Sequence, residues 1–268
     1  MGDNNEDKNY IIHIKTVQSG AFRILIEALK EILTDTNLLF DESGIKLITT
    51  DSTKTVLIHM KLEEDKFELY KCEEPITCGI CMLNLYKLIK TISNQDTLTL
   101  YIKRNNTNKL GIIINNDEKK SQTKYELNLL DISEEPLNPT RVEFDSEISF
   151  PSTDFQKIIR DMINIGTNIE IKSVGKSLML SCEGDFANQE TILHSTTDGL
   201  KFISSNSEDK PVQGIFSLKY LVLFTKCTNL SGSIELYLKN DYPLIIKYNI
   251  ASIGDIKLCL APITSNED

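Results

Sequence analysis

The sequence predicts an α+β fold with antiparallel sheets, built as two similar domains that each pack two helices on their sheets. Two observations support this prediction. Segments that alternate polar and apolar residues outnumber the helical segments, and short stretches recur along the chain at a nearly constant offset. Alternating strands keep one face in a core and the other in water, which is typical of antiparallel sheets. The 268 residues, 40% of them hydrophobic, are enough for two domains with separate cores.

The repeat becomes visible when two pairs of segments are aligned. "TLTLYIK" at 97–103 matches "SIELYLK" at 233–239 without a gap, at an offset of 136. "FRILIEALKEI" from Phe22 matches "FQKIIRDMINI" from Phe155, at an offset of 133. A duplicated domain explains both matches. We therefore expect an N-terminal domain at 9–130, a connector at 131–147, a C-terminal domain at 148–263, and flexible termini at 1–8 and 264–268.

Four segments have the period of an amphipathic helix. In the first, apolar residues recur at intervals of three and four: Phe22, Leu25, Ile26, Leu29 and Leu33. The other three are "LNLYKLIKTI", the segment that follows "PSTDF", and "SLKYLVLFTKC". Side chains that favour the N-cap position stand near their starts: Asn84 in the second helix, Ser152 or Thr153 in the third, and Ser217 in the fourth.

The segments between these helices alternate in the manner of strands. They are 44–52, 55–62, 97–103, 125–130, 178–184, 234–239 and 243–250, and turn-forming clusters such as "RNNTNK" and "KNDYP" separate them. The connector has two prolines and six acidic residues without a clear period. Its one large apolar residue in the middle is Leu137, which stands between Pro136 and Pro139.

Basic side chains recur on one side of every predicted helix. They are spaced three or seven residues apart, and both spacings return to nearly the same helical face. The pairs are Arg23 and Lys30, Lys87 and Lys90, Lys157 and Arg160, and Lys219 and Lys226. For a single helix the alternative is an ordinary solvated face, on which Glu27 pairs with Arg23. Because the pattern recurs in corresponding places of both halves, we expect the eight cations to line one surface.

A cationic surface on a chain with a net charge of −10 suits a phosphate backbone. Lysine binds phosphates through salt-sensitive contacts that do not read the base sequence. No set of Arg, Asn or Gln side chains stands out for reading bases, and there are neither interleaved aromatic residues for stacking nor any Trp. The sequence therefore predicts sequence-independent binding of duplex DNA.

Catalysis, cofactors and metals receive little support from the sequence. The three histidines are scattered, and no phosphate-binding Gly-rich loop or nucleophile motif occurs. Asp51 has no partner at a useful spacing, so we expect it to cap a turn. Cys78 and Cys81 form a C-x-x-C ahead of a helix, which leaves a dithiol oxidoreductase as an alternative of a different class. We expect a protein that is not an enzyme and that has no cofactor, metal or membrane span.

Several segments together resemble the proliferating cell nuclear antigen family of DNA sliding clamps, of the eukaryotic or large-DNA-virus type. They include "SGIKLITTDST", "FPSTDFQKIIRDMINIG", "FSLKYLVLFTKCTNLSGSIELYL" and the closing "LAP", and the similarity extends over about residues 10–263. The resemblance implies a ring-shaped trimer whose helices surround duplex DNA while its sheets form the outside. The eight cations selected by helical spacing match the channel cations of the family.

The resemblance also implies partners and the residues that bind them. Subunits would pair through edge strands near 122–129 and 185–194. The interface residues would be Tyr125, Leu127, Phe186, Thr191 and Leu193. A pocket would bind the short plug (PIP-box-like) motifs of DNA polymerase, the clamp loader and other replication or repair proteins. Its residues would be Thr50, Leu57, Leu137, Pro243, Cys259, Ala261 and Pro262. We expect these proteins, duplex DNA and two further copies of the chain as partners.

Some positions depart from the family pattern. Thr50 stands where the family usually has Met, and Cys259 where it has Tyr, so the preference of the pocket for its partners is open. Two further readings also remain open at this point: a processivity factor of the same fold that works as a monomer, and one subunit of a heterotrimer. The resemblance implies a location in the nucleus, or in a cytoplasmic viral factory if a virus encodes the chain.

Overall fold

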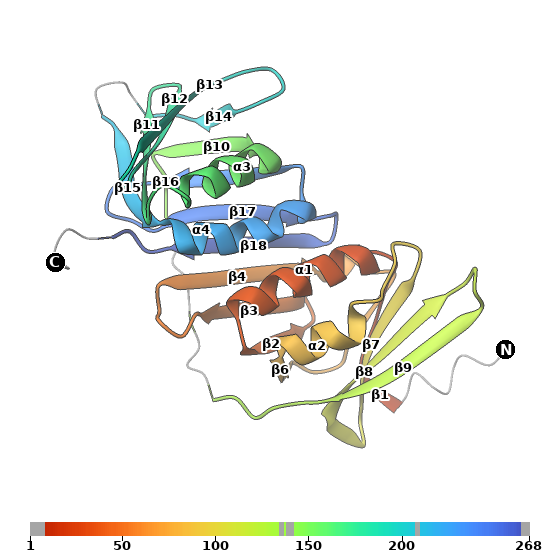
Figure 1. The fold of residues 1–268 in the computed structure, drawn as a ribbon. Coiled ribbons are helices and arrows are strands. Elements are labelled where there is room, and N and C mark those ends of the chain that lie inside the picture. Colours follow the sequence, from red (N-terminus) through yellow and green to blue (C-terminus); the bar gives the residue numbers. More distant parts are fainter. Residues whose placement is uncertain (1–8, 134–136, 138–141, 207–209, 264–268) are drawn as a thin grey trace. The chain divides into compact units, whose positions relative to one another are not determined.

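The computed structural model describes residues 9–133, 137, 142–206 and 210–263 (Figure 1). The chain forms two compact units. The first contains Met1–Thr49, His59–Leu137 and Ile250–Ile256, and the second contains Thr50–Ile58, Asn138–Asn249 and Lys257–Asp268. The termini expected to be flexible lie outside the described residues, as do Pro136 and Pro139 of the connector.

Two helices and many strands make up each half of the chain. The first half contains β1 (Tyr10–Thr16), α1 (Ser19–Ile32), β2 (Asp35–Asp41), β3 (Gly44–Thr50), β4 (Val56–Glu63), the 3₁₀ helix η2 (Glu64–Lys66), β5 (Leu69–Cys72), β6 (Ile76–Cys81), α2 (Met82–Ile89), β7 (Thr97–Lys103), β8 (Asn106–Asn116) and β9 (Ser121–Asn128). The second half contains β10 (Ser146–Pro151), α3 (Ser152–Met162), β11 (Asn168–Val174), β12 (Ser177–Glu183), β13 (Asn188–His194), β14 (Lys201–Ser204), β15 (Val212–Ser217), α4 (Leu218–Phe224), the 3₁₀ helix η3 (Thr225–Leu230), β16 (Ser233–Leu238), β17 (Leu244–Ile250) and β18 (Gly254–Leu260).

The strand order shows the internal repeat more clearly than the sequence does. The first half has the orders β5-β1-β7-β8-β9 and β4-β3-β2-β6, and the second has β14-β10-β16-β17-β18 and β13-β12-β11-β15. Each strand of the first half thus corresponds to the strand nine places later. The strands pair in antiparallel registers, for example with His13 opposite Tyr101 and Leu180 opposite Thr191. The α+β class with antiparallel sheets is confirmed.

In each unit the two α-helices lie side by side (Figure 1). Most residues of their buried faces are apolar. Of the residues predicted from the helical period, Phe22, Leu25, Ile26 and Leu29 lie in α1 and are at most 2% exposed, whereas Leu33 follows the helix and is 6% exposed. In α3, Phe155 and Ile159 are fully buried, and the ring of Phe155 meets that of Phe150 edge to face, with centroids 5.9 Å apart. Packing of these faces, rather than intrinsic helix propensity, stabilises such short helices.

The predicted helix starts are partly wrong. Asn84 and Thr153 lie inside α2 and α3, and α3 begins at Ser152, whose hydroxyl donates to the carbonyl of Ser231 instead of capping the helix. Ser217 does occupy the N-cap position of α4, without a side-chain cap hydrogen bond.

Side-chain caps are dispensable at these starts because strands run directly into the helices and loop carbonyls accept the first helical N–H groups. The N–H of Met82 donates to the carbonyl of Thr34 (2.9 Å), and the N–H of Leu218 donates to that of Thr167 (2.9 Å). Thr34 and Thr167 are equivalent positions of the repeat. Strand β10 begins at Ser146, so the last two residues of the predicted connector belong to a strand. The predicted domain boundaries otherwise stay predictions.

Candidate nucleic-acid interface

Six of the eight predicted DNA-contacting cations are exposed on the helical segments. Lys87 lies in the last turn of α2, Lys90 is its C-cap residue, and Lys157 and Arg160 lie on α3. Lys219 lies in the first turn of α4, but Lys226 lies in η3, because the α-helix ends at Phe224. In the described parts of the chain, none of these six side chains forms an ion pair. Their charges therefore remain available to an external anion.

The two cations of α1 have a different environment. Only 25% of the Arg23 side chain and 15% of the Lys30 side chain are exposed. Nη1 of Arg23 donates to the Glu27 carboxylate at 3.2 Å, and Lys30 pairs with Glu31. Nζ of Lys30 also lies 4.8 Å from the ring centroid of Tyr86 on α2. These two cations are therefore already engaged within the protein.

Tyr86 joins the two helices of the first unit. Its hydroxyl donates to Glu27 Oε1 at 3.1 Å, so that one carboxylate holds both Arg23 and Tyr86. Burial and the hydrogen bond to Glu27 raise the pKa of Tyr86 above its ordinary value, so the phenol stays protonated and continues to donate. The Arg23–Glu27 pair belongs to the alternative that helical spacing had left open for a single helix, but no pattern within one helix could reveal a contact with the next helix.

The tyrosine of α4 makes a second link that sequence reasoning missed. Nζ of Lys219 lies 5.7 Å from the Tyr220 ring centroid, and the Tyr220 hydroxyl is 3.0 Å from Thr53 Oγ1. Thr53 belongs to the turn between β3 and β4 that Asp51 organises. Asp51 accepts hydrogen bonds from the N–H groups of Thr55 and Val56, both at 2.8 Å. Although burial opposes ionisation, the hydrogen bonds from the Thr53 hydroxyl and from the N–H groups of Val56, Thr53 and Thr55 lower the pKa of Asp51, in line with the predicted turn-capping role.

The predicted interface strands lie at sheet edges. Strand β9 pairs only with β8, and β13 pairs only with β12, within the described residues. Tyr125 and Leu127 on β9 are half-buried, as are Thr191 and Leu193 on β13. Phe186 is 77% exposed but precedes β13, because the N–H of Gly184 closes a turn onto the carbonyl of Ala187. A bare edge of this kind favours pairing with another strand.

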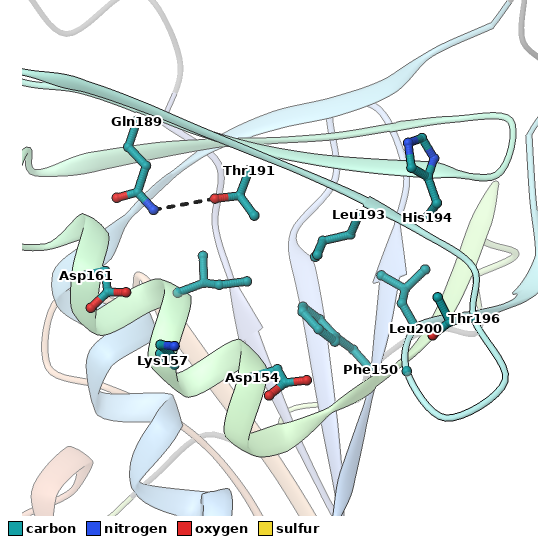
Figure 2. Close-up of a pocket in the computed structure, with 12 residues that line it drawn as sticks. Phe150, Asp154, Lys157, Asp161, Gln189, Thr191, Leu193, His194, Thr196 and Leu200 are labelled. Carbon is teal, nitrogen blue, oxygen red and sulfur yellow. Dashed lines mark hydrogen bonds between the residues drawn. The ribbon is translucent and has the colours of Figure 1, made fainter.

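A pocket of about 450 Å³ lies between α3 and the edge strand β13 (Figure 2). Its lining is apolar at the centre and charged toward α3. The lining residues are Phe150, Asp154, Lys157, Ile158, Asp161, Gln189, Thr191, Leu193, His194, Thr196, Gly199 and Leu200. Thr191 and Leu193 of the predicted interface are among them, which gives the edge strand a hollow beside it for a bulky side chain.

Six of the seven residues of the predicted partner pocket belong to the second unit. All six are half-buried: Thr50, Leu57, Pro243, Cys259, Ala261 and Pro262. The N–H of Ala261 donates to the carbonyl of Thr55 (3.0 Å), a pairing that in an antiparallel ladder sets Leu57 opposite Cys259. Burial raises the pKa of the Cys259 thiol to about 11, so this side chain is uncharged at neutral pH. Leu137, an exposed residue, belongs to the first unit.

The environment of Cys78 argues against dithiol chemistry. Cys78 is fully buried in β6, and burial raises its pKa to about 12, whereas a redox-active cysteine needs a lowered value. Cys81 is three residues away on the same strand, a spacing that points the two side chains to opposite faces. Among the described residues, no group of His, Cys, Asp and Glu side chains could hold a metal ion, and no helix could span a membrane.

Comparison with known proteins identifies two family domains along the chain. Residues 11–136 match the description "Proliferating cell nuclear antigen, N-terminal domain", and residues 140–263 match "Proliferating cell nuclear antigen, C-terminal domain". The chain is 36% identical over 264 residues to a probable DNA polymerase sliding clamp 1 of Paramecium bursaria Chlorella virus 1, with 97% of this chain and 100% of the relative aligned.

A second relative is the proliferating cell nuclear antigen of Chaetomium thermophilum. It is 28% identical over 260 residues, which cover 96% of this chain and 100% of the relative. The crystal structure of the Entamoeba histolytica protein of that name superposes with a TM-score of 0.87 at 26% identity, over 95% of this chain and 100% of the other. The similarities thus span both halves of the repeat.

Proposed function

Since the chain belongs to the proliferating cell nuclear antigen family, we propose that it is a DNA sliding clamp that encircles duplex DNA and tethers DNA polymerase to it. The observation that carries the proposal is the set of six exposed cations on the helical segments, which form no ion pairs among the described residues of a chain with a net charge of −10. Such cations bind phosphates without reading bases, and weak contacts of this kind allow movement along DNA.

The ring is proposed to be a homotrimer closed by β9 of one copy and β13 of the next. Both strands are bare edges among the described residues, and head-to-tail pairing uses each of them once per subunit. The pocket beside β13 is suited to receive an apolar or aromatic side chain of β9, such as Leu127 or Tyr125. Burial of those side chains would add a hydrophobic contribution to the backbone hydrogen bonds.

Partner proteins are proposed to bind where Leu57, Cys259, Ala261 and Pro262 come together. These residues form a small, largely uncharged surface, suited to a short segment that carries aliphatic and aromatic side chains. DNA polymerase, a clamp loader and other replication or repair proteins with plug motifs are the proposed partners. The chain itself is proposed to be non-catalytic, and its proposed place of action is the nucleus or a viral replication site.

Polymerase assays on primed circular DNA test the proposal directly. With a polymerase and a loader of this family, the protein should lengthen the products made in one binding event. A variant with Leu193→Asp should lose this effect, because a carboxylate in the pocket beside β13 prevents closure of the ring. Ile203→Asp is the matched control, since Ile203 is exposed on the short strand β14 outside the pocket. Equal stimulation by both variants would refute the proposed role of β13.

A clamp that works as a monomer is the second candidate, because the described chain folds as two compact units with cores of their own. Light scattering separates the two candidates. The ring requires a mass of about three times 30.4 kDa at micromolar concentration. A mass of 30.4 kDa, together with processive synthesis, would favour the monomer, or a subunit that needs different sister subunits.

A further inference from the structure

Glu27 is a negative charge within the cationic helical surface of the first unit. Its side chain is 45% exposed, and it lies one helical turn after Arg23 and one before Glu31. One carboxylate oxygen accepts from Arg23 (3.2 Å) and the other from the hydroxyl of Tyr86 (3.1 Å). Both oxygens are therefore occupied, and the hydrogen bond from Tyr86 fixes Glu27 in place from the neighbouring helix.

Arg23 is only partly satisfied in this arrangement. Its Nε is buried and has no hydrogen-bond partner in the structure, although its Nη1 binds Glu27. A buried donor without a partner is unfavourable, so the pair with Glu27 leaves the guanidinium incompletely satisfied. Arginine binds phosphate with two parallel hydrogen bonds when it is free to reach it. The ion pair to Glu27 competes directly with such binding.

We propose that Glu27 limits the grip of this clamp on DNA by holding Arg23 away from the phosphates, and that Tyr86 is a positioning residue that acts through Glu27. The inference rests on the proposed function, because it concerns the same helical surface. It explains why Arg23 is held in an ion pair, whereas the six cations outside α1 form none in the described chain. A clamp that moves along DNA needs contacts that break easily, and a fixed carboxylate among its cations keeps them weak.

The test measures binding of the full-length protein to a short linear duplex over a range of salt concentrations. The Glu27→Gln variant should release Arg23 and so add one phosphate contact. This contact should steepen the slope of the logarithm of the DNA association constant against log salt by about 0.9, which corresponds to about eightfold tighter binding at 0.1 M salt. Diffusion of the loaded variant along DNA, followed by single-molecule tracking, should slow accordingly. Glu118→Gln is the matched control, since it changes the net charge equally in an exposed turn outside the helices.

Two double variants assign the roles. If Glu27 acts by holding Arg23, Glu27→Gln should have little effect in an Arg23→Gln background. If Tyr86 acts through Glu27, Tyr86→Phe should tighten binding in the wild type and change nothing in a Glu27→Gln background. An effect of Tyr86→Phe that persists without the carboxylate would overturn the positioning role.

The outcomes distinguish this inference from the proposed function. If the wild-type protein neither binds duplex DNA nor moves along it, the sliding-clamp proposal itself fails. If the wild type binds and moves but Glu27→Gln matches Glu118→Gln in slope and diffusion, only the inference about Glu27 fails.

Discussion

Replacing Lys87, Lys157 and Lys219 by alanine removes one exposed ammonium group from each of three helices. All three side chains are exposed, and none forms an ion pair in the described chain, so their loss should leave the folded core unchanged. Lys157 also lines the pocket beside β13, so the mass of the assembly has to be measured for this variant. Each lysine that contacts a phosphate contributes about 0.9 to the slope of log K against log salt. Loss of all three contacts should flatten the slope by about 2.7, which is on the order of 500-fold in affinity at 0.1 M salt.

The assay is the salt dependence of binding to a short linear duplex, with light scattering to show that the assembly is unchanged. The matched control replaces three exposed lysines that lie outside the helices, Lys119, Lys176 and Lys210, and therefore alters the net charge equally. The 500-fold loss is an upper limit, because not every ammonium group contacts a phosphate at one time. A slope equal to that of the control variant would refute the placement of these helices against DNA.

Three further results are expected. Phe155→Ala should destabilise the unit that contains α3 by about 3 to 5 kcal/mol, because Phe155 is fully buried; a denaturant midpoint equal to the wild type would contradict the packing of α3. Leu57→Ala should weaken the binding of plug peptides by about 1 to 3 kcal/mol in calorimetry, and unchanged affinity would locate the partner pocket elsewhere. The free energy of unfolding should fall as the pH rises above about 9, because burial raises the pKa of Cys78 and of Cys227 to about 12 and the unfolded chain therefore loses these thiol protons first. Urea unfolding at several pH values measures this fall. An unchanged free energy of unfolding between pH 9 and pH 11 would show that the thiols are accessible.

The sequence predicted the buried faces well because one physical rule decides them. Phe22 and Phe155 start equivalent apolar stripes, and both are buried, as are Leu85 and Leu221 at the other offset of the repeat. Alternation of polar and apolar residues, which marks strands with one face in a core, predicted β3, β4, β7, β9, β12, β16 and β17 but missed other strands, such as β1, β2 and β8. The position of Lys226 was less predictable, because the helical period does not reveal that α4 changes to a 3₁₀ helix after Phe224.

Contacts between elements decided what the sequence could not show. The caps at Asn84 and Thr153 were wrong because the carbonyls of Thr34 and Gly232, distant in sequence, accept the first helical N–H groups. The network of Arg23, Glu27 and Tyr86 needed the relative position of α1 and α2. The sequence did not distinguish among the eight cations. In the described structure, two of them form ion pairs with carboxylates and six form none.

Retention on circular DNA tests the central claim most directly. The protein is loaded onto nicked circular DNA, the free protein is removed, and a restriction enzyme then linearises the circle. A ring that holds DNA only by surrounding it should stay on the closed circle and leave the linear form through its ends. Equal retention before and after linearisation would mean that the protein grips DNA directly, and the sliding-clamp account would be wrong.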